Sequence, residues 1–138
     1  MRATPLPREL AKRFEDVTGA ILSKEYGPIE TSAVTHINPT NRRDRKFGSI
    51  GLPISDTIAK IVDVETGTKE MAVGETGEVA AHGPQVMMDY CGKLDQAENV
   101  MRGINGRRFF LTGDIGHTDE EGFFVISDRN KQMMDVGA

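Results

Sequence analysis

LTGDIGHTDEEGFF, residues 111–124, reads as a strand and a tight acidic turn, with a glycine and an aspartate interrupting the strand. One interpretation is a β-hairpin with a decorated loop, in which Asp114 satisfies turn amides. The other is that Asp114 faces a ligand. Evidence from the rest of the sequence is needed to choose between these two interpretations.

Size and composition limit the classes of protein. The chain has 138 residues, 38% of them hydrophobic and 28% charged, which is typical of one globular domain. A net charge of −4 gives no basic field for nucleic acid, and no apolar run approaches the ~20 residues of a membrane span. The N-terminus lacks the apolar core of a signal peptide. A single cysteine, Cys91, excludes an internal disulfide framework, so we expect a cytoplasmic protein.

The pattern of residues predicts a fold that contains helices but is mostly β. Leu6, Leu10, Phe14 and Val17 recur at helical spacing before Gly19, a natural helix stop. A second, brief helix is expected from Leu94 to Arg102, with Asp95 as N-cap. Strands are expected in three segments: AVTHINP (33–39), TIAKIVDVE (57–65) and GETGEVAAHG (74–83). The predicted fold is one or two helices on an antiparallel, β-barrel-like core.

The common catalytic signatures are missing. The sequence has no GxxxxGK[ST], GxGxxG or GxSxG motif, and its three histidines are far apart in the chain. Cys91 has no basic neighbour that would lower the pKa of its thiol, which favours a structural role. NRRDRK (41–46) is the one basic cluster, and without interleaved aromatic residues it is interpreted as a solvated loop.

Three clusters remain as candidates. Tyr26-Gly27-Pro28-Ile29-Glu30-Thr31-Ser32 puts an aromatic ring beside a bend and a carboxylate, a set suited to a flat ring and hydrated magnesium, or simply to a capped turn. The Asp114 carboxylate is able to accept hydrogen bonds from a ribose diol. Arg129, in the DRNK segment, is either a phosphate or sugar contact or the polar end of a strand. Each cluster alone favours the structural interpretation.

Read in order, however, four blocks resemble the AMP-forming adenylating superfamily, and within it the long-chain fatty acyl-CoA ligases. The blocks are YGPIETSAVTHINP (26–39), FGSIGLPISDTIAKIVDVETG (47–67), VGETGEVAAHGPQVMMDY (73–90) and FFLTGDIGHTDEEGFFVISDRNK (109–131). The resemblance covers nearly the whole chain. It implies an α+β fold, mostly β: a distorted antiparallel β-barrel subdomain with a flanking strand and short helices. Residues 1–46 would belong to the adenylate-binding subdomain and 47–138 to the β-barrel, ending at a hinge.

The resemblance also implies site residues. Tyr26 would stack on adenine, Gly27 would allow close approach of the backbone, and Asp114 and Arg129 would contact the ribose. ATP or AMP binding would further involve Glu30 and Thr31, with Glu30 as the magnesium ligand. Lys131 would lie at the hinge. The family reaction joins a fatty acid to ATP, and coenzyme A (CoA) then displaces AMP.

Three residues depart from the family pattern: Ile29 replaces a threonine, Asp89 a glycine, and Asp135 stands where some relatives have a basic residue. The phosphate loop and the domain with the catalytic lysine have no counterpart, so we expect a section of the large domain that is inactive alone, with no catalytic residue of its own. The alternatives are a non-catalytic nucleotide-binding module and a degenerate remnant acting as an interaction surface. In the last case an exposed apolar patch and self-association are expected; a companion chain that supplies the missing parts is also open.

Overall fold

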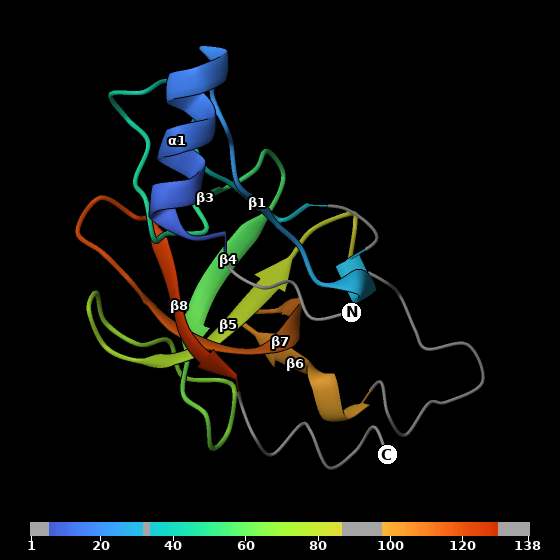
Figure 1. Ribbon diagram of the computed structural model, residues 1–138. Helices are drawn as coiled ribbons and strands as arrows, with labels where there is room; N and C mark the ends of the chain where they lie inside the picture. The colour runs from blue at the N-terminus through green and yellow to red at the C-terminus, as the bar shows by residue number, and fades with distance from the viewer. Residues whose placement is uncertain (1–5, 32–33, 87–97, 130–138) are drawn as a thin grey trace, which may run out of the picture.

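The computed structural model describes residues 6–31, 34–86 and 98–129 (Figure 1). Its elements in chain order are α1 (Arg8–Thr18), β1 (Glu25–Tyr26), the 3₁₀ helix η1 (Ile29–Thr31), β2 (His36–Ile37), β3 (Leu52–Pro53), β4 (Ile58–Val62), β5 (Gly77–His82), β6 (Met101–Ile104), β7 (Arg107–Thr118) and β8 (Phe124–Arg129). The mostly β, antiparallel class expected from the sequence is confirmed.

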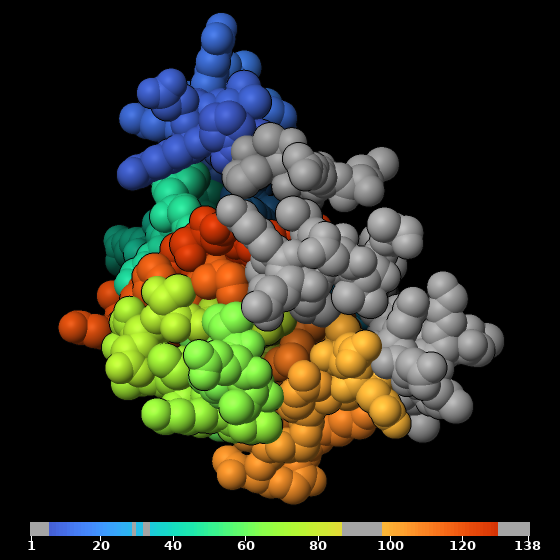
Figure 2. Space-filling model, turned by 90° about the horizontal axis from the view of Figure 1, so that it is seen from below, coloured from blue at the N-terminus to red at the C-terminus, as the bar shows by residue number. Residues whose placement is uncertain are grey.

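Helix α1 forms where the apolar spacing predicts it. It starts after Pro7, and Gly19 ends it with φ of 71°, a left-handed conformation that glycine adopts without strain. The buried residues of the helix are Ala11 and Glu15, whereas the apolar stripe of the sequence is exposed. Leu10 is 54% exposed and Phe14 47%. Figure 2 shows α1, in blue, projecting from one end of the described surface. The apolar side chains of α1 thus face away from the described part of the molecule.

The basic cluster at 41–46 holds α1 in place, so its interpretation as a solvated loop is wrong for Arg45. The Arg45 and Glu15 side chains form an ion pair and are only 6% and 8% exposed. Arg45 also donates to the Leu22 carbonyl at 3.1 Å and lies over the ring of Phe47 at 4.3 Å. Hydrogen bonds from Arg45, then from the Leu22 amide, lower the pKa of Glu15 to about 2. A buried pair of this kind fixes the helix to the loop.

Two antiparallel sheets make up the body of the molecule. The small sheet has the order β1-β2-β3, and the large, curled sheet has the order β4-β5-β7-β6, with β8 also paired to β7. The two are joined by backbone hydrogen bonds: Ile50 N–H donates to the Phe124 carbonyl at 2.9 Å, and Phe124 N–H to the Gly51 carbonyl at 3.0 Å. A Cβ at Gly51 would lie 2.1 Å from the Ile37 carbonyl oxygen, so only glycine fits between the strands.

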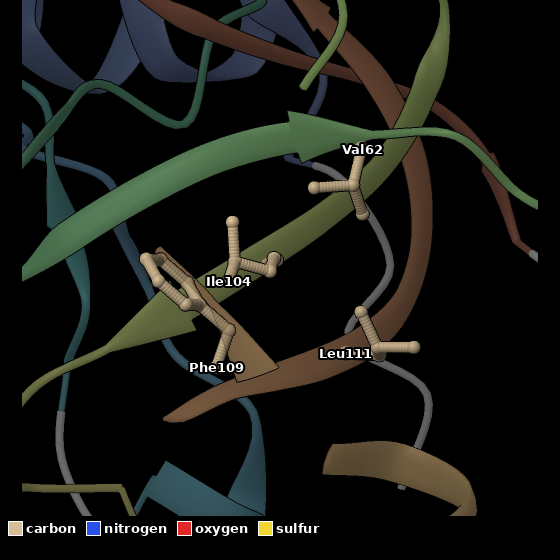
Figure 3. Close-up of a cluster of buried hydrophobic side chains, with 5 residues drawn as sticks. Val62, Ile104, Phe109 and Leu111 are labelled. Carbon is tan, nitrogen blue, oxygen red and sulfur yellow. The ribbon is translucent and has the colours of Figure 1, made fainter. Parts of the chain in front are cut away.

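Both faces of the large sheet are covered. On one face a cluster contains Val62, Ala80, Ile104, Phe109 and Leu111, and the labelled side chains converge in Figure 3. On the other face a cluster contains Ile50, Ile61, Val79 and Phe124. Ile61 and Val62, like Val79 and Ala80, are adjacent in the chain, and successive strand residues point to opposite faces. This explains why the three consecutive apolar residues of β5, Val79, Ala80 and Ala81, are all buried.

The second helix was predicted too long. Residues 98–100 are helical, but Met101 and Arg102, placed in the helix by the prediction, begin strand β6. Asn105 and Gly106 have φ of 51° and 75° and connect β6 to β7 as a tight hairpin. Asn-Gly between strand-forming residues is a strong hairpin signal, and it outweighs the helical pattern here. Leu94 and Asp95 lie outside the described residues.

Strand β7 changes its neighbour along its length. Its first half pairs with β6 up to Met101↔Phe110, and its second half pairs with β8 from Asp114↔Arg129 onward. Against β5 the register slips between Glu78 and Ala80, which is a β-bulge in the segment 112–114. The glycine and aspartate therefore do not break the strand. They mark the point at which it leaves one partner and meets the next.

Among the described residues, no helix is long and apolar enough to cross a membrane.

Candidate functional site

The bulge of β7 is held by buried partners. Glu78 on β5 is 3% exposed, and its Oε1 accepts a hydrogen bond of 2.9 Å from the Gly113 N–H. Thr112 Oγ1 donates to the Val79 carbonyl at 2.9 Å and accepts from the Asp114 N–H at 3.2 Å. Gly113 has φ of 77°, in the region that favours glycine. These contacts fix the backbone from which the Asp114 side chain projects.

Tyr26, from the other end of the sequence, meets Asp114. Its hydroxyl donates a hydrogen bond to Asp114 Oδ2. The ring is half-buried and packs against the core cluster that contains Phe124. Burial, followed by the charge of Asp114 and the hydrogen bond to it, raises the pKa of Tyr26 above its ordinary value. The phenol is therefore neutral and a hydrogen-bond donor at physiological pH.

Arg129 contacts the same carboxylate from β8. Its Nε lies 3.2 Å from Asp114 Oδ1, which the pairing Asp114↔Arg129 brings within reach. The Arg129 side chain is 68% exposed and that of Asp114 13%. An ion pair with one exposed partner contributes little to stability, and its long side chain keeps most of its freedom.

The turn after Tyr26 carries the remaining candidates. Thr31 is fully buried, and its N–H and hydroxyl both donate to the Pro28 carbonyl, at 3.0 and 2.7 Å. This closes η1, a single 3₁₀ turn. Glu30 is half-buried on the same turn, and Gly27 is exposed. The buried threonine fixes the turn, and this limits the positions available to the Glu30 carboxylate.

His36 lies beneath Tyr26 and was not anticipated as part of this region. It is fully buried, its Nδ1 is 2.9 Å from Thr35 Oγ1, and its Nε2 has no hydrogen-bond partner among the described residues. Its ring meets Tyr26 edge-on at 5.7 Å and Phe124 at 4.7 Å. Burial lowers the pKa of His36 to about 4, so the ring is neutral. It serves as a packing surface for Tyr26.

The structure thus brings together three of the predicted residues: Tyr26, Asp114 and Arg129. Gly27, Glu30 and Thr31 follow within one turn of Tyr26, and Lys131 lies outside the described residues. Sequence reasoning missed Glu78 and Thr112. The signal was available, because a glutamate inside an apolar strand needs a buried partner.

The sequence matches one protein family over most of its length. A family model described as AMP-binding enzyme matches residues 1–91, which is 91 of the 138 residues. The chain belongs to the AMP-binding enzyme family. The matched residues include Tyr26 and Glu30, whereas Asp114 and Arg129 lie beyond them.

Within this AMP-binding family, the relatives are acyl-CoA ligases. A long-chain-fatty-acid–CoA ligase of Bacillus subtilis (strain 168) is 44% identical over 133 residues, which are 96% of this chain and 22% of the relative. A crystal structure of a long-chain-fatty-acid-CoA ligase (FadD1) from Archaeoglobus fulgidus has a TM-score of 0.83 and 28% identity, covering 95% of this chain and 28% of that one. ATP-bound MatB from Rhodopseudomonas palustris has a TM-score of 0.81 and 31% identity, covering 94% and 24%. The chain thus spans between 22% and 28% of the length of these three proteins.

Proposed function

We propose that this chain forms the adenosine-binding part of an AMP-forming acyl-CoA ligase that acts on fatty acids. The observation that carries the proposal is the contact of Asp114 with both Tyr26 and Arg129, three polar side chains from distant segments gathered at a bulge. The ligase relatives support the chemistry, and the B. subtilis relative supports fatty acids as the substrate class.

Each residue has a part in holding the nucleotide. The Tyr26 ring stacks on adenine, and Gly27 leaves room for the base and sugar to approach the backbone. The Asp114 carboxylate accepts hydrogen bonds from the ribose hydroxyls, each charge-assisted bond being worth about 1.5–3 kcal/mol. Arg129 keeps its contact with Asp114 and assists at the ribose.

The turn of Glu30 and Thr31 serves the phosphates. Thr31 fixes the turn through its bonds to the Pro28 carbonyl. The donor set fits magnesium, which takes one or two carboxylates together with phosphate oxygens, so Glu30 would hold it. When bound, magnesium neutralises phosphate charge during attack of the fatty acid carboxylate on the α-phosphorus of ATP.

The proposed overall reaction has two steps. The fatty acid and ATP form an acyl-adenylate with release of pyrophosphate, and the CoA thiol then displaces AMP to give the acyl-CoA. The residues described here bind and orient the nucleotide. We propose that the 138 residues alone bind nucleotide without turnover, with residues 1–46 and 47–138 as two subdomains and the hinge at Lys131. The cytoplasmic location stays a prediction.

A calorimetric titration with a non-hydrolysable acyl-adenylate analogue and magnesium tests the proposal. The wild-type chain should bind saturably, and Asp114→Ala should lose at least about tenfold in affinity, the equivalent of one charge-assisted hydrogen bond. The matched control is Asp16→Ala, an exposed aspartate on α1. Circular dichroism confirms that each variant is folded. Equal binding by the wild type and Asp114→Ala would remove the site from this region.

A further inference from the structure

One hydrogen bond links the two segments that would contact adenosine. The Tyr26 hydroxyl donates to Asp114 Oδ2 across a sequence separation of 88 residues. An ionised carboxylate only accepts hydrogen bonds, and the half-buried phenol stays protonated, because burial and the Asp114 charge raise its pKa. The donor and the acceptor of this hydrogen bond are therefore fixed.

The position of the hydroxyl is also fixed. Tyr26 is paired with His36 in the small sheet, and its carbonyl accepts the Thr35 N–H at 2.8 Å. Its ring packs edge-on against the buried His36 ring, which itself contacts Phe124 at 4.7 Å. A tyrosine held in this way by backbone and ring contacts delivers its hydroxyl to one place. It thus restrains the rotation of the Asp114 carboxylate.

The acceptor sites of Asp114 then match a diol. A carboxylate has two oxygens with about four acceptor positions in total. The Tyr26 hydroxyl occupies one on Oδ2, and Arg129 Nε, at 3.2 Å, occupies one on Oδ1. Each oxygen keeps about one further position. Two adjacent hydroxyl groups of a ribose are two donors at the spacing of two carboxylate oxygens.

We infer that the Tyr26 hydroxyl is a positioning group for sugar recognition, holding Asp114 so that it accepts from both ribose hydroxyls and prefers ribonucleotides to deoxyribonucleotides. The inference rests on the proposed function and deepens it. It gives the hydroxyl a role separate from the stacking of the ring on adenine. A single side chain would couple recognition of the base to recognition of the sugar.

Tyr26→Phe separates the two roles, because it keeps the aromatic face and removes only the hydroxyl. The experiment compares the affinities of the wild-type and Tyr26→Phe chains for AMP and for 2′-deoxy-AMP by calorimetry. The wild type should prefer AMP. Tyr26→Phe should reduce that preference about three- to tenfold, the value of one hydrogen bond. The affinity for 2′-deoxy-AMP, which keeps only one of the two hydroxyls, should fall by less than the affinity for AMP.

A double-mutant cycle with Asp114→Ala supplies a readout that a merely structural role would not move. In the Asp114→Ala background, Tyr26→Phe should have no further effect on the preference, since the positioned group is gone. An unchanged preference in Tyr26→Phe, or an equal loss for both nucleotides, overturns the inference and leaves the proposed function standing. A folded wild-type chain that binds neither nucleotide overturns both.

Discussion

Truncation of Phe109 to alanine tests the account of the core. Phe109 is 1% exposed and packs with Val62, Ala80, Ile104 and Leu111, which come from four different strands. Because those strands are joined by backbone hydrogen bonds, the surrounding residues have little freedom to fill the space left by the ring. We expect Phe109→Ala to cause one of the larger losses of stability available to this chain.

The size of the expected loss of stability follows from the apolar area that Phe109 buries and from the cavity that its removal leaves. A phenylalanine buries about 150–250 Å², and at about 25 cal/mol/Å² the transfer contribution is about 4–6 kcal/mol. Measured Phe→Ala substitutions in cores cost about 3–5 kcal/mol, and the fully enclosed position of Phe109 favours the upper half of this range. A typical domain has only about 5–15 kcal/mol of net stability, so the variant should be close to unfolding.

Urea denaturation followed by circular dichroism measures the free energy of unfolding. The matched control is Phe14→Ala, the same chemical change on the exposed face of α1, where the side chain is 47% exposed. Its cost should be below about 1 kcal/mol, because alanine is also the better helix former. If the two variants lost the same stability, the reasoning on the core and on the exposed face of α1 would be wrong.

Three further outcomes are expected. The pKa of Glu15 in the folded state is lowered to about 2, so its pair with Arg45 should stabilise the fold fully above the ordinary glutamate pKa of about 4.3. This contribution should be lost as the pH falls from there toward 2. Glu15→Gln should therefore flatten this part of the pH–stability profile. Tyr26 should stay protonated in an ultraviolet titration beyond the ordinary tyrosine pKa of about 10. Asp114→Asn should lower the pKa of Tyr26 toward that value. If the variant titrated like the wild type, the contact between Tyr26 and Asp114 would be contradicted. Gly116→Ala should cost at least about 2 kcal/mol in a thermal unfolding assay, since its Cβ would lie 2.1 Å from a carbonyl oxygen of β8; wild-type stability would refute the β7–β8 register.

Local patterns predicted the regular elements well. The spacing of Leu10, Phe14 and Val17 predicts α1, and the β-branched segment around Ile58–Val62 predicts β4. The predicted C-terminal boundary of the second helix was wrong, because Met101 and Arg102 pair with β7 across the Asn105-Gly106 turn and are therefore strand residues. Helical and strand preferences compete in such short segments, and pairing decides between them.

The candidate site was predicted residue by residue from motif resemblance, but the contacts among its residues were not. Tyr26 and Asp114 are 88 positions apart, and no local pattern reports a hydrogen bond over that distance. The support from His36 was equally hidden, because it depends on burial that is created by strands from elsewhere in the chain.

The sequence by itself determined which residues are candidates for nucleotide binding and where most of the helices and strands lie, because turn residues, apolar spacing and motif order act over short distances. Only the tertiary structure decided what those residues do together. The bulge at Thr112–Asp114 serves as the place where β7 passes from β6 to β8, and Tyr26 reaches it through the small sheet. Likewise, only the tertiary structure decided that the apolar stripe of α1 is exposed and that Glu15 is buried in an ion pair with Arg45, a residue 30 positions along the chain.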